Sequence, residues 1–201
     1  MSKLYLHPLP LRIWHWANAC IVLVLIMTGI QLRVPSIQIL HDYRYVVLLH
    51  KYFGYAMAGS FLFWFFYYLA TGGLTKHYLM GLQDVKSMPQ QALYYVLHIF
   101  RGEKNPFVPT PDSKFNSLQK LAYSSVMLVF VPIIVITGVL FSDILFFFSW
   151  IKALGGLRIL DAVHVAAAYV FILYLLVHLY MATLGPKLHS HIKGMITGYE
   201  E

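Results

Sequence analysis

Four long apolar stretches dominate this sequence of 201 residues and limit the folds open to it. A helix needs about 20 apolar residues to cross the hydrocarbon core of a bilayer, and each stretch reaches that length. Runs of this length favour helices over buried strands. The expected spans lie at about residues 13–32, 45–70, 118–141 and 162–184. The sequence therefore predicts an all-α, integral membrane four-helix bundle in which residues 1–201 form a single domain.

The composition supports a membrane protein and excludes several other classes. Hydrophobic residues make up 59% and charged residues 11% of the chain, against about 45–50% and about 25% in soluble domains. A soluble protein of this composition would expose mostly hydrocarbon to water. The single cysteine, Cys20, excludes a disulfide framework, a cysteine-rich zinc site and a cysteine-bound iron–sulfur cluster within the chain. Covalent c-type haem attachment is excluded as well, because the sequence has no CXXCH motif.

Two shorter segments are expected to lie in the membrane interface, as one or two additional helices. Residues 92–101 are expected to form a short interfacial helix between the second and third spans. Residues 144–160 are rich in aromatic side chains, but Lys152, two glycines and Arg158 interrupt them, so we expect no fifth span here. The first span is longer than the apolar core of a signal peptide and lacks a small-x-small cleavage site, so we expect it in the mature protein.

The distribution of basic residues predicts the orientation. With four spans, both termini and the loop at residues 71–117 share one side of the membrane. That side carries ten of the Lys and Arg residues and the opposite side carries five. The positive-inside rule then places both termini in the cytoplasm. The net charge of +7 is explained by this placement, and no nucleic-acid partner is expected.

Four of the ten histidines lie in or at the edge of the spans, where an ionisable side chain is costly and usually functional. They are His15, His50, His164 and His178. The other six lie in loops, tails or the interfacial helix, and no function is assigned to them.

The four histidines form two pairs by depth. His164 and His178 share the fourth span, 14 residues apart, so both face the same way at a separation of about 21 Å. His164 lies at the outer level, like His50. His178 lies at the cytoplasmic level, like His15. Axial bis-histidine ligation of two non-covalent b haems requires this arrangement.

Other interpretations of the histidines stay open on the sequence alone. For each histidine taken alone, a role in an interhelical hydrogen bond explains its position as well as a role as a metal ligand does. A zinc site is disfavoured, because its ligands need to lie at one level. Small residues one turn after three of the histidines leave room for a porphyrin but also suit ordinary helix packing. These small residues are Gly54, Ala168 and Ala182.

Basic residues at the two membrane faces have two interpretations of equal weight. They are at depths suited to pairing with haem propionates, and equally suited to anchoring in the headgroup region. These residues are Arg12, Arg44, Lys51 and Arg158. A short echo also links residues 27–30 (MTGI) with residues 136–139 (ITGV), and small residues at helix interfaces explain it without a duplication.

The chain resembles the bacterial di-haem cytochrome b family over nearly its whole length. The segments that carry the resemblance are HPLPLRIWHW at residues 7–16, KFNSLQK at 114–120, HLYMA at 178–182 and MITGY at 195–199. The family includes the gamma subunit of formate dehydrogenase, the b-type cytochrome of nickel–iron hydrogenase and the thiosulfate-reductase-type cytochrome b subunit. The sequence is most similar to the thiosulfate-reductase-type branch of the family, although its short C-terminus is more similar to that of the hydrogenase branch. The resemblance implies a multi-pass protein of the bacterial inner (cytoplasmic) membrane.

The resemblance also implies site residues. It gives the same haem pairs, His50 with His164 and His15 with His178. It adds a site for menaquinone or ubiquinone beside the cytoplasmic haem, which maps onto Asn116 and Gln119. A helix cap is an equally good explanation of Asn116.

These features predict a membrane-anchoring di-haem cytochrome b subunit of a respiratory oxidoreductase, carrying electrons between an extracytoplasmic partner and the quinone pool. The expected partners are an iron–sulfur or multihaem cytochrome subunit and a catalytic subunit, docked on the outer loops. The chain is itself an enzyme only if quinone is oxidised or reduced at its own site. The alternative is a stand-alone di-haem quinone oxidoreductase that acts on a small external oxidant such as superoxide or ferric iron. A transporter is disfavoured, because the span interiors lack Asp and Glu.

Overall fold

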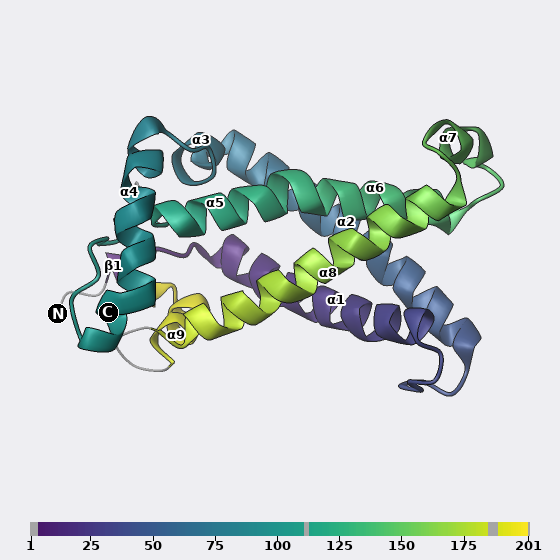
Figure 1. Ribbon diagram of the computed structural model, residues 1–201, viewed down its shortest axis with the longest axis horizontal. Helices are drawn as coiled ribbons and strands as arrows, with labels where there is room; N and C mark the ends of the chain where they lie inside the picture. Colours follow the sequence, from purple (N-terminus) through teal and green to yellow (C-terminus); the bar gives the residue numbers. More distant parts are fainter. Residues whose placement is uncertain (1–3, 111–112, 185–188, 201) are drawn as a thin grey trace.

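The chain forms four long helices, which are arranged as an elongated bundle (Figure 1). The computed structural model describes residues 4–110, 113–184 and 189–200. The long helices are α1 (Leu9–Arg33), α2 (Tyr43–Ala70), a composite helix from Ser117 to Ser142, and α8 (Leu157–Ala182). All four are long and apolar enough to cross a membrane. The predicted all-α membrane helical bundle is confirmed.

Most side chains on these helices are not covered by the rest of the chain. Large apolar side chains are exposed on every span, among them Leu62 and Phe66 on α2 and Leu173 and Leu176 on α8. Apolar surface on this scale aggregates in water but is solvated by lipid acyl chains, and helices satisfy their backbone hydrogen bonds internally. The protein is therefore a multi-pass membrane protein.

The third span contains a proline and accommodates it with one wider helical turn. It consists of α5 (Ser117–Ser125), the π-helical turn η3 (Val126–Phe130) and α6 (Val131–Ser142). Pro132, near the start of α6, has no N–H to donate, and its ring conflicts with the carbonyl one turn earlier. The wider π turn directly before it accommodates the proline, so the helix continues to Ser142.

The remaining elements are short and lie at the two ends of the bundle (Figure 1). At one end are β1 (Leu4–Tyr5), α3 (Gly73–His77), α4 (Leu82–Leu93), η1 (Tyr94–His98), η2 (Ile99–Arg101), α9 (Ser190–Thr197) and β2 (Tyr199–Glu200). At the other end are the connection between α1 and α2, and α7 (Phe148–Ala153).

The helix expected at residues 92–101 is the second half of a longer helical segment. This segment runs from α4 through η1 and η2 and lies across the end of the bundle (Figure 1). It begins earlier than expected because Asp84 Oδ2 accepts a hydrogen bond from Gly81 N at 2.7 Å, which caps α4 before its apolar half begins. Lys120 Nζ on α5 also donates to Asp84 Oδ2, at 2.8 Å, and ties α4 to the third span. Burial alone raises the pKa of Asp84, but the hydrogen bonds from Lys120 and Gly81 outweigh it, and the net pKa is lowered.

The segment at residues 144–160 contains no fifth span, as expected. It consists of a turn and the six-residue helix α7, whose Ile151 packs against Leu140 and Leu160. Gly155 and Gly156 follow α7 with φ angles of 98° and 87°, which side chains rarely adopt. They redirect the chain so that α8 starts at Leu157, five residues before the expected start of the span. Arg158 therefore belongs to the first turn of α8.

The two ends of the chain are joined. β1 pairs antiparallel with β2, and the backbone N–H groups of Leu6 and His7 both donate to the Gly198 carbonyl. A Cβ on Gly198, whose φ is 91°, would lie 2.7 Å from the Tyr5 ring. Arg12 Nη1 and Trp16 Nε1 on α1 donate to carbonyls in the last turn of α9. The motifs at residues 7–16 and 195–199 are thus two halves of one contact.

Candidate metal centres

The structure brings the four span histidines together in the pairs expected from the sequence. His15 on α1 and His178 on α8 have ring centroids 6.1 Å apart. His50 on α2 and His164 on α8 have ring centroids 6.3 Å apart. Because α8 contributes one histidine to each pair, its length sets the distance between the two sites. The His15–His178 pair lies toward the end with the chain termini, and the His50–His164 pair lies toward the α7 end.

The spacing of each pair suits two imidazoles on opposite sides of one metal ion. With a metal–nitrogen bond of about 2 Å and a ring radius of about 1 Å, such imidazoles have centroids about 6 Å apart. The rings are inclined at 58° and 71°, so neither pair is stacked face to face. Among the described residues, no group of three or more His, Cys, Asp or Glu side chains surrounds a common point. Each pair thus offers two ligands only, which suits an ion held in the plane of a porphyrin.

Glycines provide space at the His50–His164 pair. A Cβ on Gly29 would lie 3.4 Å from His50 Cε1, and a Cβ on Gly138 would lie 3.4 Å from His164 Cε1. The position of a Cβ on Gly54, one turn after His50, has nothing within 4 Å. The first two glycines let the rings approach the neighbouring helix, and the third leaves open space beside the ligand. The residues present therefore fit a flat macrocycle.

Two threonines hold the histidines of the same pair. Thr28 Oγ1 on α1 lies 2.9 Å from His50 Nδ1, and Thr137 Oγ1 on α6 lies 2.8 Å from His164 Nδ1. Both threonines belong to the sequence echo at residues 27–30 and 136–139. Helix packing was a sufficient explanation of that echo, and the sequence alone assigned these threonines no role. The repeated Thr-Gly dipeptide is the feature of the sequence by which these threonines could have been found.

The His15–His178 pair is surrounded by aromatic rings instead. The Tyr174 ring stacks on His178 with centroids 5.7 Å apart, and the Tyr123 ring meets it edge-on at 6.2 Å. Trp16 meets His15 edge-on at 5.4 Å. This pair therefore lies in a large apolar and aromatic environment.

An apolar layer separates the two pairs. Its buried members are Val22, Met57, Val126, Val131 and Phe171. Phe171 is seven residues from both His164 and His178, so it lies midway between them along α8. Packed hydrocarbon of this kind excludes water from the space between the sites and keeps the dielectric low.

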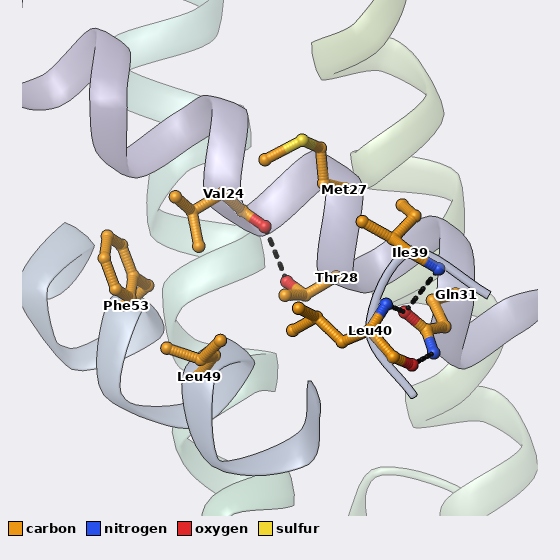
Figure 2. Close-up of a pocket in the computed structure, with 8 residues that line it drawn as sticks. All are labelled: Val24, Met27, Thr28, Gln31, Ile39, Leu40, Leu49 and Phe53. Atoms are coloured by element: carbon orange, nitrogen blue, oxygen red, sulfur yellow. Dashed lines mark hydrogen bonds between the residues drawn. The ribbon is translucent and has the colours of Figure 1, made fainter. Parts of the chain in front are cut away.

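An apolar cavity adjoins Thr28 (Figure 2). Its volume is about 210 Å³, and apart from Thr28 and Gln31 it is lined by Val24, Met27, Ile39, Leu40, Leu49 and Phe53. The buried Gln31 holds the connection between α1 and α2 over it, accepting from Ile39 N at 3.2 Å and Leu40 N at 3.0 Å and donating to the Leu40 carbonyl at 2.6 Å. The lining suits a hydrocarbon group rather than a charged ligand.

The four basic residues considered for propionates have different surroundings. Lys51 Nζ donates to the Ser142 carbonyl at 2.9 Å, at the end of α6. Arg44 and Arg158 are exposed. Arg12 lies one turn before His15, and its Nε is buried with no hydrogen-bond partner among the described residues. Of the four, Arg12 therefore has a buried donor left for an anionic group.

Asn116 and Gln119 form a capping box at the start of α5. Asn116 Oδ1 accepts from Gln119 N at 2.9 Å, and Gln119 Oε1 accepts from Asn116 N at 3.1 Å. Asn116 Nδ2 also donates to the Tyr95 hydroxyl at 2.9 Å, and Asn116 is buried. Burial raises the pKa of Tyr95, so this hydroxyl stays protonated. The capping role considered for Asn116 is therefore present in the structure.

Four membrane-spanning helices with paired histidines toward both ends are the architecture of a membrane cytochrome b. The chain belongs to the prokaryotic cytochrome b561 family, whose sequence profile matches residues 6–198. This confirms the family indicated by the sequence motifs, and it implies haem b as the cofactor and electron transport in a membrane as the role.

Two relatives are similar over most of their length. The putative cytochrome YdhU of Escherichia coli (strain K12) is 30% identical over 212 residues, covering 98% of this chain and 75% of that protein. The cytochrome b556(Fdn) subunit of nitrate-inducible formate dehydrogenase from the same strain is 26% identical over 192 residues, covering 93% of this chain and 79% of that subunit.

Proposed function

We propose that this protein is the di-haem membrane anchor of a multi-subunit respiratory oxidoreductase, and that it carries electrons between an extracytoplasmic partner and the membrane quinone pool. The observation that carries the proposal is the presence of two histidine pairs that share α8, with centroid distances of 6.1 and 6.3 Å. In this proposal residues 1–201 form one domain in the bacterial inner membrane with both termini in the cytoplasm. In Figure 1, β1, α9 and α4 lie at the same end of the bundle, as that orientation requires.

The chain's own residues hold, space and insulate the cofactors. His15 with His178 and His50 with His164 would each hold one haem b, and the haems supply one-electron redox chemistry. The helix α8 fixes the separation of the two ligands it carries at about 21 Å, because a helix rises about 1.5 Å per residue. The apolar layer around Phe171 keeps water out of the interval between the sites. Arg12 would pair with a propionate through its buried Nε.

A partner subunit would dock at the α7 end. The relative in formate dehydrogenase is named as a subunit of that enzyme, which supports assembly into a larger complex. The α7 region exposes Leu145, Phe146, Phe148 and Trp150. We propose that this end takes an iron–sulfur or multihaem cytochrome subunit, and through it a catalytic subunit. The His50–His164 pair would then accept electrons from it or donate electrons to it.

The quinone would bind beside the His15–His178 pair, near the start of α5. Within the described residues, the hydrogen bonds of Asn116 and Gln119 are mainly those of the capping box, and no hydrogen bond involves Gln119 Nε2. A quinone carbonyl needs a hydrogen-bond donor, and the Gln119 amide nitrogen is available for this purpose. The cap would hold Gln119 in place while its Nε2 contacts menaquinone or ubiquinone.

Haem-to-protein stoichiometry tests the proposed function. We expect the purified chain to contain two non-covalent b haems, measured by the pyridine haemochrome assay and the reduced-minus-oxidised spectrum. Two haems require four axial ligands, and the span histidines provide that number. A chain that binds no haem would reduce the histidines to packing groups and overturn the proposal.

Substitution of Gln119 tests the quinone site. Gln119→Glu keeps the oxygen that accepts from Asn116 N and removes the amide donor. We expect a menaquinone or ubiquinone analogue to oxidise the reduced haem about tenfold more slowly, the size of effect expected for one lost hydrogen bond. The haem content and spectrum should stay as in the wild type. If both Gln119→Glu and Gln119→Leu retain the wild-type rate, Gln119 is a capping residue alone.

A further inference from the structure

The two threonine–histidine contacts have the same construction on different helices. On one side Thr28 and Gly29 of α1 contact His50 of α2, and on the other Thr137 and Gly138 of α6 contact His164 of α8. The contact distances differ by only 0.1 Å, at 2.9 and 2.8 Å. An accidental contact has no reason to occur twice with the same dipeptide and the same ring atom.

The hydrogen bonds of each threonine determine the direction of the contact. A hydroxyl has a single proton to donate. Thr28 Oγ1 lies 2.7 Å from the Val24 carbonyl (Figure 2), and Thr137 Oγ1 lies 2.7 Å from the Ile133 carbonyl. With that proton donated to the carbonyl one turn earlier, the hydroxyl oxygen accepts a hydrogen bond from the histidine. The proton of each neutral imidazole is therefore on Nδ1, and the lone pair is on Nε2.

The glycines lie against the same edge of each ring as the threonine hydroxyls. Cε1 lies between the two ring nitrogens, and a Cβ at either glycine would be 3.4 Å from it. Each imidazole thus presents its Nδ1–Cε1 edge to a helix where a hydroxyl contacts Nδ1 and a glycine leaves room for the close approach of Cε1. Rotation of the ring that exchanged its nitrogens would lose the hydrogen bond.

We propose that Thr28 and Thr137 are positioning residues that fix the tautomer and the ring orientation of His50 and His164 for axial ligation of haem. The proposal rests on the proposed function of these histidines as ligands. An imidazole whose Nδ1–H donates to an acceptor is a more basic ligand. Removal of that acceptor typically weakens metal retention about 10–100-fold. A more basic ligand stabilises the ferric state, so these threonines lower the reduction potential of the haem they serve.

The effect is confined to one of the two sites. Within the described residues, the contacts of the His15 and His178 rings are aromatic and include no hydroxyl on a ring nitrogen. The two haems therefore differ in ligand basicity as well as in position. Loss of the threonine hydroxyls should change one haem and leave the other as an internal reference.

The test compares valine and serine at both positions. Valine has nearly the shape of threonine without the hydroxyl, whereas serine keeps the hydroxyl. We expect Thr28→Val and Thr137→Val each to speed the transfer of one haem to a haem-scavenging apoglobin about 10–100-fold. Redox titration should show a higher midpoint potential for that haem alone, and its low-spin electron paramagnetic resonance signal should shift. Thr28→Ser and Thr137→Ser should restore all three properties.

The matched control is Thr71→Val. Thr71 Oγ1 donates to the carbonyl of Tyr67 four residues earlier, the same bond that Thr28 and Thr137 make, but Thr71 is exposed and has no hydrogen bond to a histidine among the described residues. It should leave both haems unchanged. If the valine variants do not assemble, Thr28→Ala and Thr137→Ala remove the hydroxyl without adding bulk.

The possible outcomes separate this inference from the proposed function. Two haems per chain with unchanged retention, potential and resonance signal in the valine or alanine variants would overturn the threonine role and leave the histidine ligands standing. The same change in both haems would also overturn it, because the contacts serve one pair. A wild-type chain without haem would overturn both proposals.

Discussion

His178→Ala should leave one haem b per chain instead of two. His178 is one of two candidate ligands in its pair, and its ring centroid lies 6.1 Å from that of His15. A b haem has no covalent bond to the protein, so the loss of an axial nitrogen removes much of what retains it. The pyridine haemochrome assay on purified protein gives the number directly.

The same substitution should stop reduction of the remaining haem by quinol. In the proposed arrangement quinone binds at the His15–His178 end, and the retained haem lies beyond the apolar layer around Phe171. Stopped-flow mixing with a quinol analogue would show a rate near zero, while dithionite should still reduce the haem. Added imidazole, which fits the space of the missing side chain, should partly restore the second haem.

His98→Ala is the control for this prediction. His98 lies on η1, its Nδ1 is 3.2 Å from Glu103 Oε2, and it belongs to neither histidine pair. Its replacement should leave two haems and the quinol reaction unchanged. Retention of both haems in His178→Ala would contradict the assigned role of His178.

Much of the fold follows from hydropathy alone. A span is a long run of apolar residues, and lipid imposes no other requirement on most of its surface, so four spans were evident in the sequence. The helix ends were less evident because they depend on local geometry. The start of α8 at Leu157 depends on the positive φ of Gly155 and Gly156, and the start of α4 depends on the contact between Asp84 and Gly81.

The histidine pairs were predictable because helical periodicity converts a 14-residue spacing into one face and two depths. The groups that hold the histidines were harder to find. Thr28 and Thr137 are small residues in apolar helices, where helix packing is a sufficient explanation. Only the tertiary structure shows that each meets the Nδ1 of a histidine on another helix. For Asn116 the structure shows the cap, and its role at a quinone site stays a prediction.

The contact between the two ends of the chain was not predicted at all. Residues 7–16 and 195–199 were recognised as separate motifs. Their contact depends on backbone hydrogen bonds to Gly198 and on side-chain bonds from Arg12 and Trp16 to the end of α9. A hydropathy pattern carries no information on such pairing, because the partners are almost 200 residues apart in the sequence.

His50→Ala should also reduce the haem content from two per chain to one, but with the opposite functional result. The haem retained by His15 and His178 lies at the proposed quinone end, so a quinol analogue should still reduce it at close to the wild-type rate. Electron exchange with an extracytoplasmic partner should be lost, because the site nearest α7 is then empty. His164→Ala should reproduce each of these results.

Double substitutions test the pairing itself. If His50 and His164 hold the same haem, His50→Ala/His164→Ala should lose no more haem than either single variant and retain one per chain. His50→Ala/His178→Ala removes one ligand from each pair and should retain none. The reverse pattern, with no haem in the first double variant and one in the second, would show that the four histidines pair differently. The counts in these two variants decide between the pairings without reference to a partner or to the type of quinone.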